Sequence, residues 1–273
     1  MTRGLDHQYF EREFDMQLGK PIMLRGQPLG GERFPVICTP LVGRSSPELL
    51  SEVQLLVALK PDLLEWRVDF FEDIGKPAAV LDLAARIKQA AAGIPLLFTR
   101  RCVREGGARI DLTEEQVVAL YGAVCRSGQV DFVDFEMGND PEHVRQVRAM
   151  SKAGHVGLIL SFHDFHSTPP IELLNQRFLQ AQEFGADVAK VAVMPGAMED
   201  VLTLLSATLQ SSQKLDIPLI SMSMGAYGSL TRLFGWAFGS ALTFAIGAGQ
   251  SAPGQLPISD LNAVQAILQR SLR

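Results

Sequence analysis

The sequence predicts an α/β protein built as a single (β/α)8 barrel. Short, continuous apolar runs alternate eight times with amphipathic helical patterns over residues 35–272. Such runs are typical of parallel strands covered by helices, and eight units in a chain of this length match a closed barrel. An open, doubly wound sheet would usually carry a Gly-rich nucleotide loop after its first strand. The segment there reads LVGRSSPE (41–48) and lacks that pattern.

The first four strands follow from apolar runs, and the helices between them from spacing and capping residues. The strands are predicted at residues 35–41, 63–70, 96–99 and 131–137, and the second helix at 77–92. Ser46, followed by Pro47, is expected to cap the first helix. Thr113 and Gln116 suit a capping box for the third helix, and Asp140 is expected to cap the fourth.

The second four units continue the alternation. Strands are predicted at 156–162, 187–193, 218–222 and 241–246, and helices at 168–185, 197–209, 229–238 and 260–272. Ahead of the first strand, residues 21–24 and 33–34 flank the turn-forming segment GQPLGG, so a short hairpin is expected to close the barrel floor. Residues 1–18 are an extension without an assigned role, and residues 19–273 form the single barrel domain.

Composition and charge exclude several classes of protein. The 273 residues carry 25 Lys+Arg against 30 Asp+Glu, a formal charge of −5 with no basic tail, so nucleic acid is not an expected partner. Three cysteines without C-x-x-C spacing argue against a disulfide framework or a thiolate zinc site, and favour a reducing cytoplasm. No charge occurs from residue 233 to 259, but Gly and Pro interrupt this run, so no membrane helix is predicted.

Charged residues within apolar strands indicate the functional end of the barrel, because alternate residues of a barrel strand face its interior. The segment LLEWRVD (63–69) places Glu65, Arg67 and Asp69 on one side. Glu65 fits either a structural ion pair or a role in a site. Arg67 lies nearer the C-terminal end of its strand, where such barrels place their chemistry.

Lys190 is the sharpest candidate for a catalytic residue. It stands alone among apolar residues in VAKVAVM (188–194), with Val188 and Ala192 as neighbours on the same face. Removal from water favours the neutral amine of a lysine, and a neutral amine attacks ketones and aldehydes. The alternative is a lysine whose ammonium group reaches solvent at the end of its strand.

Two histidines, His163 and His166, lie at the end of the fifth strand. Because no further cluster of His or Cys accompanies them, a general acid–base role is favoured over a metal site. The pattern alone does not choose between the two. The loop 251–255 after the eighth strand fits either a lid over a bound ligand or an ordinary Pro/Gly connection.

Arginines gather at the same end of the barrel. Arg101 follows the third strand and Arg232 the seventh, so both are expected to meet Arg67 and Lys190 at the C-terminal rim. This local positive cluster is what an acidic protein needs in order to bind an anion. Arginine suits a carboxylate in particular, because its planar fork binds both oxygens.

These residues lie in segments that resemble the type I 3-dehydroquinate dehydratase family. The matching segments are LLEWRVD (63–69), LLFTRR (96–101), EGG (105–107), LSFHDFH (160–166), AKVAVMP (189–195), SMSMG (221–225), TR (231–232) and SAPGQ (251–255). The resemblance implies a (β/α)8 barrel that forms a homodimer and needs no metal or organic cofactor. It also implies the dehydration of 3-dehydroquinate to 3-dehydroshikimate in the shikimate pathway.

By the same resemblance, individual residues receive roles. Lys190 matches the Schiff-base lysine, His163 the catalytic histidine and Glu105 the carboxylate that supports this histidine, so the resemblance selects His163 over His166. The positions that match substrate-binding residues are Glu65, Arg67, Arg101, Arg232, Ser251 and Gln255.

Two other functions fit part of the pattern. Another Schiff-base barrel, an aldolase-type lyase, would use Lys190 to cleave a C–C bond. A non-catalytic barrel would bind a carboxylate metabolite, although binding alone requires neither a buried nucleophile nor an acid–base partner.

Overall fold

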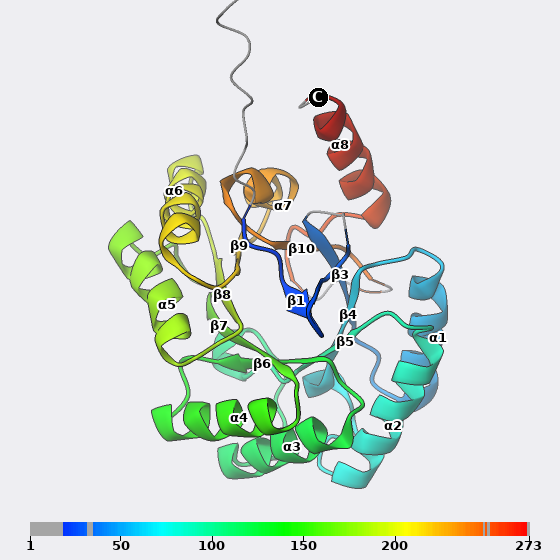
Figure 1. The fold of residues 1–273 in the computed structure, drawn as a ribbon. Helices are drawn as coiled ribbons and strands as arrows, with labels where there is room; N and C mark the ends of the chain where they lie inside the picture. Colours follow the sequence, from blue (N-terminus) through cyan, green and yellow to red (C-terminus); the bar gives the residue numbers. More distant parts are fainter. Residues whose placement is uncertain (1–18, 32–34, 248, 250–251, 272–273) are drawn as a thin grey trace, which may run out of the picture.

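The computed structural model describes residues 19–31, 35–247, 249 and 252–271, and it confirms the predicted barrel. Eight parallel strands lie in the order β10-β3-β4-β5-β6-β7-β8-β9 and form the ring seen in Figure 1. They are β3 (Val36–Leu41), β4 (Leu63–Arg67), β5 (Leu96–Thr99), β6 (Phe132–Glu136), β7 (Gly157–Asp164), β8 (Val188–Val193), β9 (Leu219–Ser223) and β10 (Leu242–Phe244). Between β9 and β10 the ring is joined by a bridge from Leu219 to Ser240.

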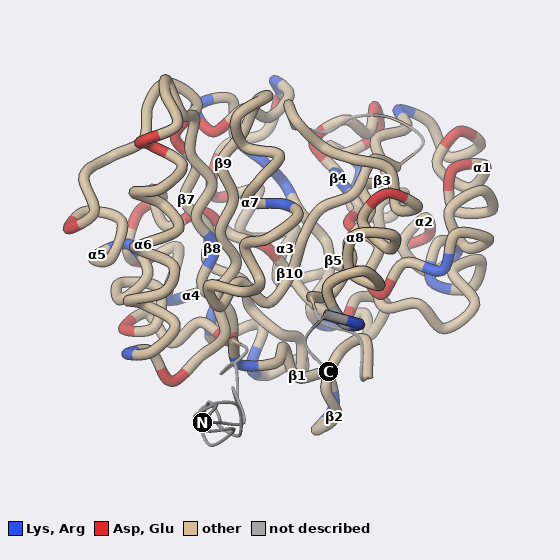
Figure 2. Tube along the Cα trace, turned by 90° about the horizontal axis from the view of Figure 1, so that it is seen from above, with Lys and Arg blue, Asp and Glu red and all other residues tan. Residues whose placement is uncertain are grey.

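Helices surround the ring, one after each strand (Figure 1). They are α1 (Ser46–Val57), α2 (Pro77–Ala90), α3 (Glu114–Ser127), α4 (Pro141–Ala153), α5 (Ile171–Glu183), α6 (Met198–Lys214), α7 (Ser229–Phe234) and α8 (Ile258–Ser271), with short 3-10 turns η2 (Val68–Phe70), η3 (Val103–Glu105) and η4 (Gly235–Phe238). Acidic and basic residues are spread over these helices (Figure 2). In the described part of the chain, no helix is long and apolar enough to cross a membrane.

Helix starts agree with the predicted capping chemistry except at α1. Thr113 and Gln116 form the expected capping box, and the Asp140 carboxylate accepts the Glu142 N–H at 2.7 Å. The cap of α1 is Ser45, not Ser46. A capping box requires an acidic or amide side chain three residues after the cap, and Glu48 stands at that distance from Ser45. The Glu48 carboxylate accepts the Ser45 N–H at 3.2 Å.

Several boundaries differ from the prediction by a few residues. The second strand ends at Arg67, because the chain turns into η2 there. α5 begins at Ile171 rather than 168, since a residue that precedes proline is disfavoured in the helical conformation, which applies to residues 168 and 169, and Pro170 itself has a non-helical ψ. β7 extends to Asp164, α6 continues to Lys214, and α8 begins two residues early.

The N-terminal hairpin is tighter than predicted. β1 (Met23–Leu24) pairs antiparallel with β2 (Gln27–Pro28), and the turn between them has positive φ at Arg25 (52°) and Gly26 (80°), as a two-residue hairpin turn requires. The predicted second flank, 33–34, and the extension 1–18 lie outside the described residues. The hairpin does close one end of the barrel (Figure 2), where Ile22 and Leu29 pack beneath the strands.

The barrel interior is layered, because every second residue of a strand points inward. The lower layer is apolar and consists of Leu63, Leu97, Phe132, Ile159, Val188, Ile220 and Leu242. Two positions further along the same strands, the layer is mostly polar and consists of Glu65, Thr99, Asp134, Ser161, Lys190, Met222 and Phe244. The sequence alternation therefore places a polar site on an apolar floor.

Candidate active site

A pocket of about 450 Å³, counted to its open mouth, lies above the polar layer at the C-terminal ends of the strands. The predicted site residues that line it are Glu65, Arg67, Arg101, Glu105, His163, Lys190, Arg232 and Gln255. Ser251 lies outside the described residues. The structure thus brings together side chains from six strands or the loops after them, while their roles remain predictions.

Lys190 is alone only within its own strand. Its side chain is 4% exposed, and its Nζ lies 2.8 Å from an Asp134 carboxylate oxygen and 3.8 Å from a Glu65 oxygen. The ring of Phe244 lies 4.6 Å from the same Nζ. The alternative of an ammonium group that reaches solvent is therefore wrong. Ala192, two residues on, also lines the pocket and leaves room beside the amine.

Asp134 is the main partner of Lys190, and it is not among the site residues predicted from the sequence. Its carboxylate also accepts hydrogen bonds from Arg101 Nη2 at 2.7 Å and from Ser161 Oγ at 2.6 Å. Burial alone would raise the pKa of Asp134, but the charges of Arg101 and Lys190 bring it well below the usual range. Asp134 is therefore a charged carboxylate matched by two cations.

The alternation in FVDFE (132–136) resembles that in VAKVAV, and it could have revealed Asp134 and Glu136. Both are acidic residues within an apolar strand, at alternate positions, and both are buried. The rule that selected Lys190 and Glu65 applies to them equally.

His163 and Glu105 form a hydrogen-bonded pair at the wall of the pocket. Glu105 Oε2 lies 2.8 Å from His163 Nδ1 and also accepts the backbone N–H of His163 at 3.1 Å. With Nδ1 turned to the carboxylate, Nε2 is the nitrogen available to a ligand. His166 is exposed and does not line the pocket, so the geometry separates the two histidines that the pattern alone left open.

The surroundings move the pKa values of this pair in opposite directions. Burial, partly opposed by Arg101 and reinforced by Glu136 and Asp134, raises the pKa of Glu105 to about 8. Burial, followed by the charges of Arg101 and Lys190, lowers the pKa of His163 well below its usual range. The histidine is therefore neutral at pH 7, and the Glu105 carboxyl binds a proton at a higher pH than an ordinary glutamate does.

The turn that carries Glu105 requires glycine at two positions. Gly106 has a φ of 81°, and a Cβ there would clash with the ring of Phe165. A Cβ at Gly107 would clash with the backbone carbonyl of Arg101. The predicted tight Gly-Gly loop is thus confirmed, and it fixes Glu105 against β7.

The arginines meet as predicted, but the expected positive cluster is largely neutralised. Arg67 binds Asp69 through Nε at 2.9 Å and Nη2 at 2.8 Å. Arg101 lies among three carboxylates: Asp134, Glu136 at 3.2 Å and Glu105 at 3.7 Å. The carboxylates of Asp134 and Glu136 were not predicted here, because they lie 33 and 35 residues from Arg101 in the chain.

Arg232 differs from the other cations of the pocket. It is 2% exposed, yet no carboxylate of the described residues contacts it, and its Nε has no hydrogen-bond partner there. Its Nη2 donates to the Pro253 carbonyl at 3.0 Å. Burial lowers the pKa of Arg232 to about 10. A buried guanidinium in this condition is suited to the carboxylate of a ligand.

A metal site is not evident in the part of the chain that the structure describes. No group of three or more His, Cys, Asp or Glu side chains is arranged there to hold a metal ion.

Comparison with known proteins places these residues in context. The family described as Type I 3-dehydroquinase matches residues 37–271. The 3-dehydroquinate dehydratase of Albidiferax ferrireducens is 60% identical over 257 residues, which cover 94% of this chain and 97% of that protein. The corresponding protein of Aromatoleum aromaticum is 52% identical over 258 residues, covering 94% and 99%.

Solved structures agree with these relatives. The 3-dehydroquinate dehydratase of Geobacillus kaustophilus superposes with a TM-score of 0.90 at 47% identity, over 94% of this chain and 99% of that one. The type I 3-dehydroquinate dehydratase of Clostridium difficile, solved with covalently modified comenic acid, gives a TM-score of 0.87 at 36% identity, over 93% and 99%.

Proposed function

The chain belongs to the type I 3-dehydroquinase family and is a hydro-lyase of the shikimate pathway that acts on 3-dehydroquinate, and we propose that it works through a Schiff base on Lys190. The observation that carries this proposal is the meeting of a buried lysine and a Glu105–His163 pair in one pocket. Family membership also favours dehydration over the aldolase-type and binding-only alternatives.

The substrate is a β-hydroxy ketone with a carboxylate, and the difficult step is removal of a proton next to the ketone. His163 Nε2 takes a proton from the Lys190 ammonium group, the resulting amine attacks the ketone carbon, and His163 returns the proton to the carbinolamine hydroxyl, which leaves as water and gives an iminium. His163 Nε2 then takes the α-proton, and the electron pair of the broken C–H bond moves into the enamine. The enamine expels the β-hydroxyl group, which leaves as water with the proton from His163. Hydrolysis of the remaining iminium frees Lys190 and the enone product.

Asp134 stabilises Lys190 both before the covalent bond forms and in the iminium. At 2.8 Å it pairs with the ammonium form of Lys190, and its negative charge lies where the positive iminium nitrogen forms. Arg101 and Ser161 hold Asp134 from the other side, so the carboxylate stays in place when the lysine forms its covalent bond.

Glu105 has two tasks in the proposed cycle. It orients the imidazole through Nδ1, and its raised pKa lets it share the proton that the pair gains when His163 takes the α-proton. General acid–base assistance of this kind contributes about 10²–10⁴-fold to the rate.

The substrate is held by groups around the mouth of the pocket. Arg232 is proposed to bind the substrate carboxylate, since it is buried and lacks a carboxylate partner among the described residues. Gln255, Arg67 and Arg101 are proposed to bind its hydroxyl groups, and Glu65 faces the amine of Lys190. Ser251 remains a predicted contact in the same loop as Gln255.

Borohydride reduction in the presence of 3-dehydroquinate tests the covalent step. Reduction of the iminium should stop turnover irreversibly, and peptide mass spectrometry should place the added mass on Lys190. Borohydride without substrate is the control, and it should leave activity unchanged. An adduct on another lysine, or inactivation without any adduct, would contradict the proposal.

We further propose that the enzyme is a cytoplasmic homodimer. Three large apolar side chains, Met198, Leu202 and Leu209, are 40–59% exposed along one face of α6, which supports association of two copies. The cysteines of the described structure are all free and buried, which suits a reducing compartment. Light scattering should give twice the mass of one chain, and Leu202→Glu should lower it. A mass equal to a single chain for the unmodified protein would contradict the dimer.

A further inference from the structure

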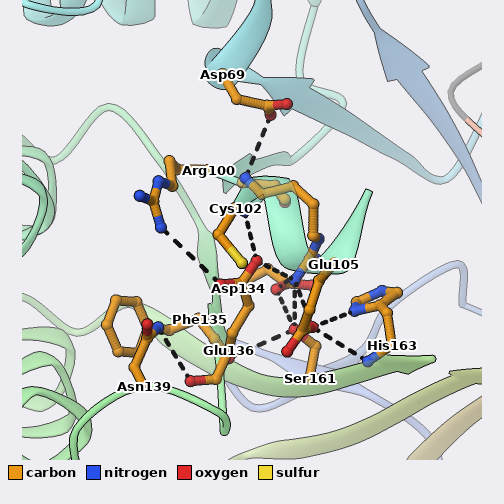
Figure 3. A network of polar contacts seen from close by, with 12 residues as sticks. Asp69, Arg100, Cys102, Glu105, Asp134, Phe135, Glu136, Asn139, Ser161 and His163 are labelled. Atoms are coloured by element: carbon orange, nitrogen blue, oxygen red, sulfur yellow. Dashed lines mark hydrogen bonds and ion pairs between the residues drawn. The ribbon is translucent and has the colours of Figure 1, made fainter. Parts of the chain in front are cut away.

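Glu136, the last residue of β6, lies beside the pocket without a role in the proposed chemistry. It is 1% exposed and does not line the cavity. One of its carboxylate oxygens, Oε1, accepts the backbone N–H of Cys102 at 2.7 Å (Figure 3). The same oxygen accepts a hydrogen bond from Arg101 Nη1 at 3.2 Å. The other oxygen, Oε2, has no hydrogen-bond partner among the described residues and lies 3.9 Å from Arg100 Nη1.

The bond to Cys102 fixes the turn that carries Glu105. The carbonyl of Cys102 accepts the N–H of Glu105 at 3.0 Å and that of Gly107 at 2.8 Å, so Cys102 anchors both sides of Glu105. Glu105 in turn holds His163 (Figure 3). An unbroken series of hydrogen bonds therefore runs from Glu136 through the backbone at Cys102 to the imidazole.

Glu136 also acts through its charge on the Glu105–His163 pair. The charged and titratable groups that face Glu105 are Arg101 just before its own turn, Asp134 and Glu136 from β6, and the neutral His163 from β7. Arg101 opposes protonation of Glu105, whereas Glu136 and Asp134 favour it. Of these four groups around Glu105, Glu136 alone neither bonds to Lys190 nor lines the pocket.

We propose that Glu136 is a positioning residue of the dehydration: it holds the turn that presents Glu105 to His163, and its charge helps to set the protonation of that pair. This inference rests on the proposed acid–base role of His163. Because one carboxylate oxygen makes both hydrogen bonds, the two effects can be separated. An amide keeps an oxygen acceptor and removes the charge, whereas alanine removes both.

The test compares Glu136→Gln and Glu136→Ala with Glu114→Gln as the matched control. Glu114 binds the adjacent Arg100 at 2.6 Å on the outer side of the barrel and does not line the pocket. Each variant is measured for kcat, for KM with 3-dehydroquinate, for the pH profile of kcat/KM and for thermal unfolding.

The Gln variant should keep most of its activity at the optimum and move the acidic limb of the profile to lower pH by roughly 0.5–1 unit. The sign follows from the base form of the pair being the active one: loss of a nearby negative charge lowers the pKa of the pair, so the base form persists to lower pH. The Ala variant should lose about 10–100-fold in kcat with little change in KM, because a displaced catalytic group costs rate. The Glu114→Gln variant should match the unmodified enzyme in kcat, KM and the pH profile, whereas loss of the charge that pairs with the buried Arg100 should lower its unfolding temperature.

Other outcomes would overturn the inference. An unmoved acidic limb in Glu136→Gln, or an activity loss in both variants that only mirrors a loss of folded protein, would leave Glu136 a merely structural residue. If the Ala variant does not fold, the Gln profile alone decides. Failure of the proposed function is separate, since it would appear as near-normal turnover after loss of His163 itself.

Discussion

Replacing Lys190 with methionine should abolish turnover, with kcat lower by about 10⁵-fold or more, as expected for loss of a covalent nucleophile. Methionine has nearly the length of lysine and fills the space beside Phe244, but it cannot attack a ketone. Without the iminium, nothing stabilises the electron pair left by the α-proton. An ultraviolet assay for enone formation from 3-dehydroquinate measures the loss, and borohydride should no longer trap an adduct.

A second variant separates nucleophilicity from charge. Lys190→Arg keeps a cation for Asp134, which lies 2.8 Å from the lysine amine, but a guanidinium remains protonated and does not form the imine. We expect it to be as inactive as the methionine variant. Lys214→Met, at the exposed end of α6, is the matched control and should keep full activity. Turnover within tenfold of the unmodified enzyme in either Lys190 variant would rule out the Schiff base.

Loss of His163 should give the second largest effect. His163→Ala is expected to lower kcat by about 10²–10⁴-fold, the usual contribution of a general acid–base group. Lys190 remains in place in this variant, so borohydride should still trap a substrate adduct, although formation of that adduct should be slower. The combination of slow turnover and retained trapping would place His163 in proton transfer rather than in the covalent bond itself.

His166 supplies the matched control for this prediction. It lies three residues away on the same segment, is exposed and does not line the pocket. His166→Ala should therefore leave both kcat and the pH profile unchanged. A large loss in His166→Ala, together with near-normal turnover in His163→Ala, would move the acid–base role away from the Glu105 pair.

The barrel was predictable because each strand and helix is marked by a local sequence pattern. The apolar runs, the capping boxes and the glycines after helices depend on neighbours within a few residues, so spacing alone places them. The errors arose where two local signals compete. Ser45 and Ser46 both suit a cap, and only the distance to Glu48 decides. The hairpin has several possible glycine turns, and the tightest one, at Arg25 and Gly26, forms.

The site was predictable in its residues but not in its charge balance. Lys190 and Arg101 are visible as charges next to apolar neighbours in the sequence. Their partner Asp134 lies 33 residues from Arg101 and 56 from Lys190, so the pairing depends on how neighbouring strands are staggered around the barrel. A pattern along one strand carries no information on that stagger. For this reason Lys190 looked isolated, and Arg232 looked like the two other arginines of the predicted cluster, Arg67 and Arg101.

The apolar layer and the hairpin beneath it close the lower side of the pocket among the residues that the structure describes. Ile22 and Leu29 cover the lower end of the barrel, and the apolar lower layer lies between them and the charged groups. Substrate and product are therefore expected to share the mouth at the C-terminal ends of the strands, which Arg232, Ala252 and Gln255 line. One molecule has to leave before the next can enter. In a pocket closed at its lower side, we therefore expect the rate of product release to limit kcat together with the chemical steps.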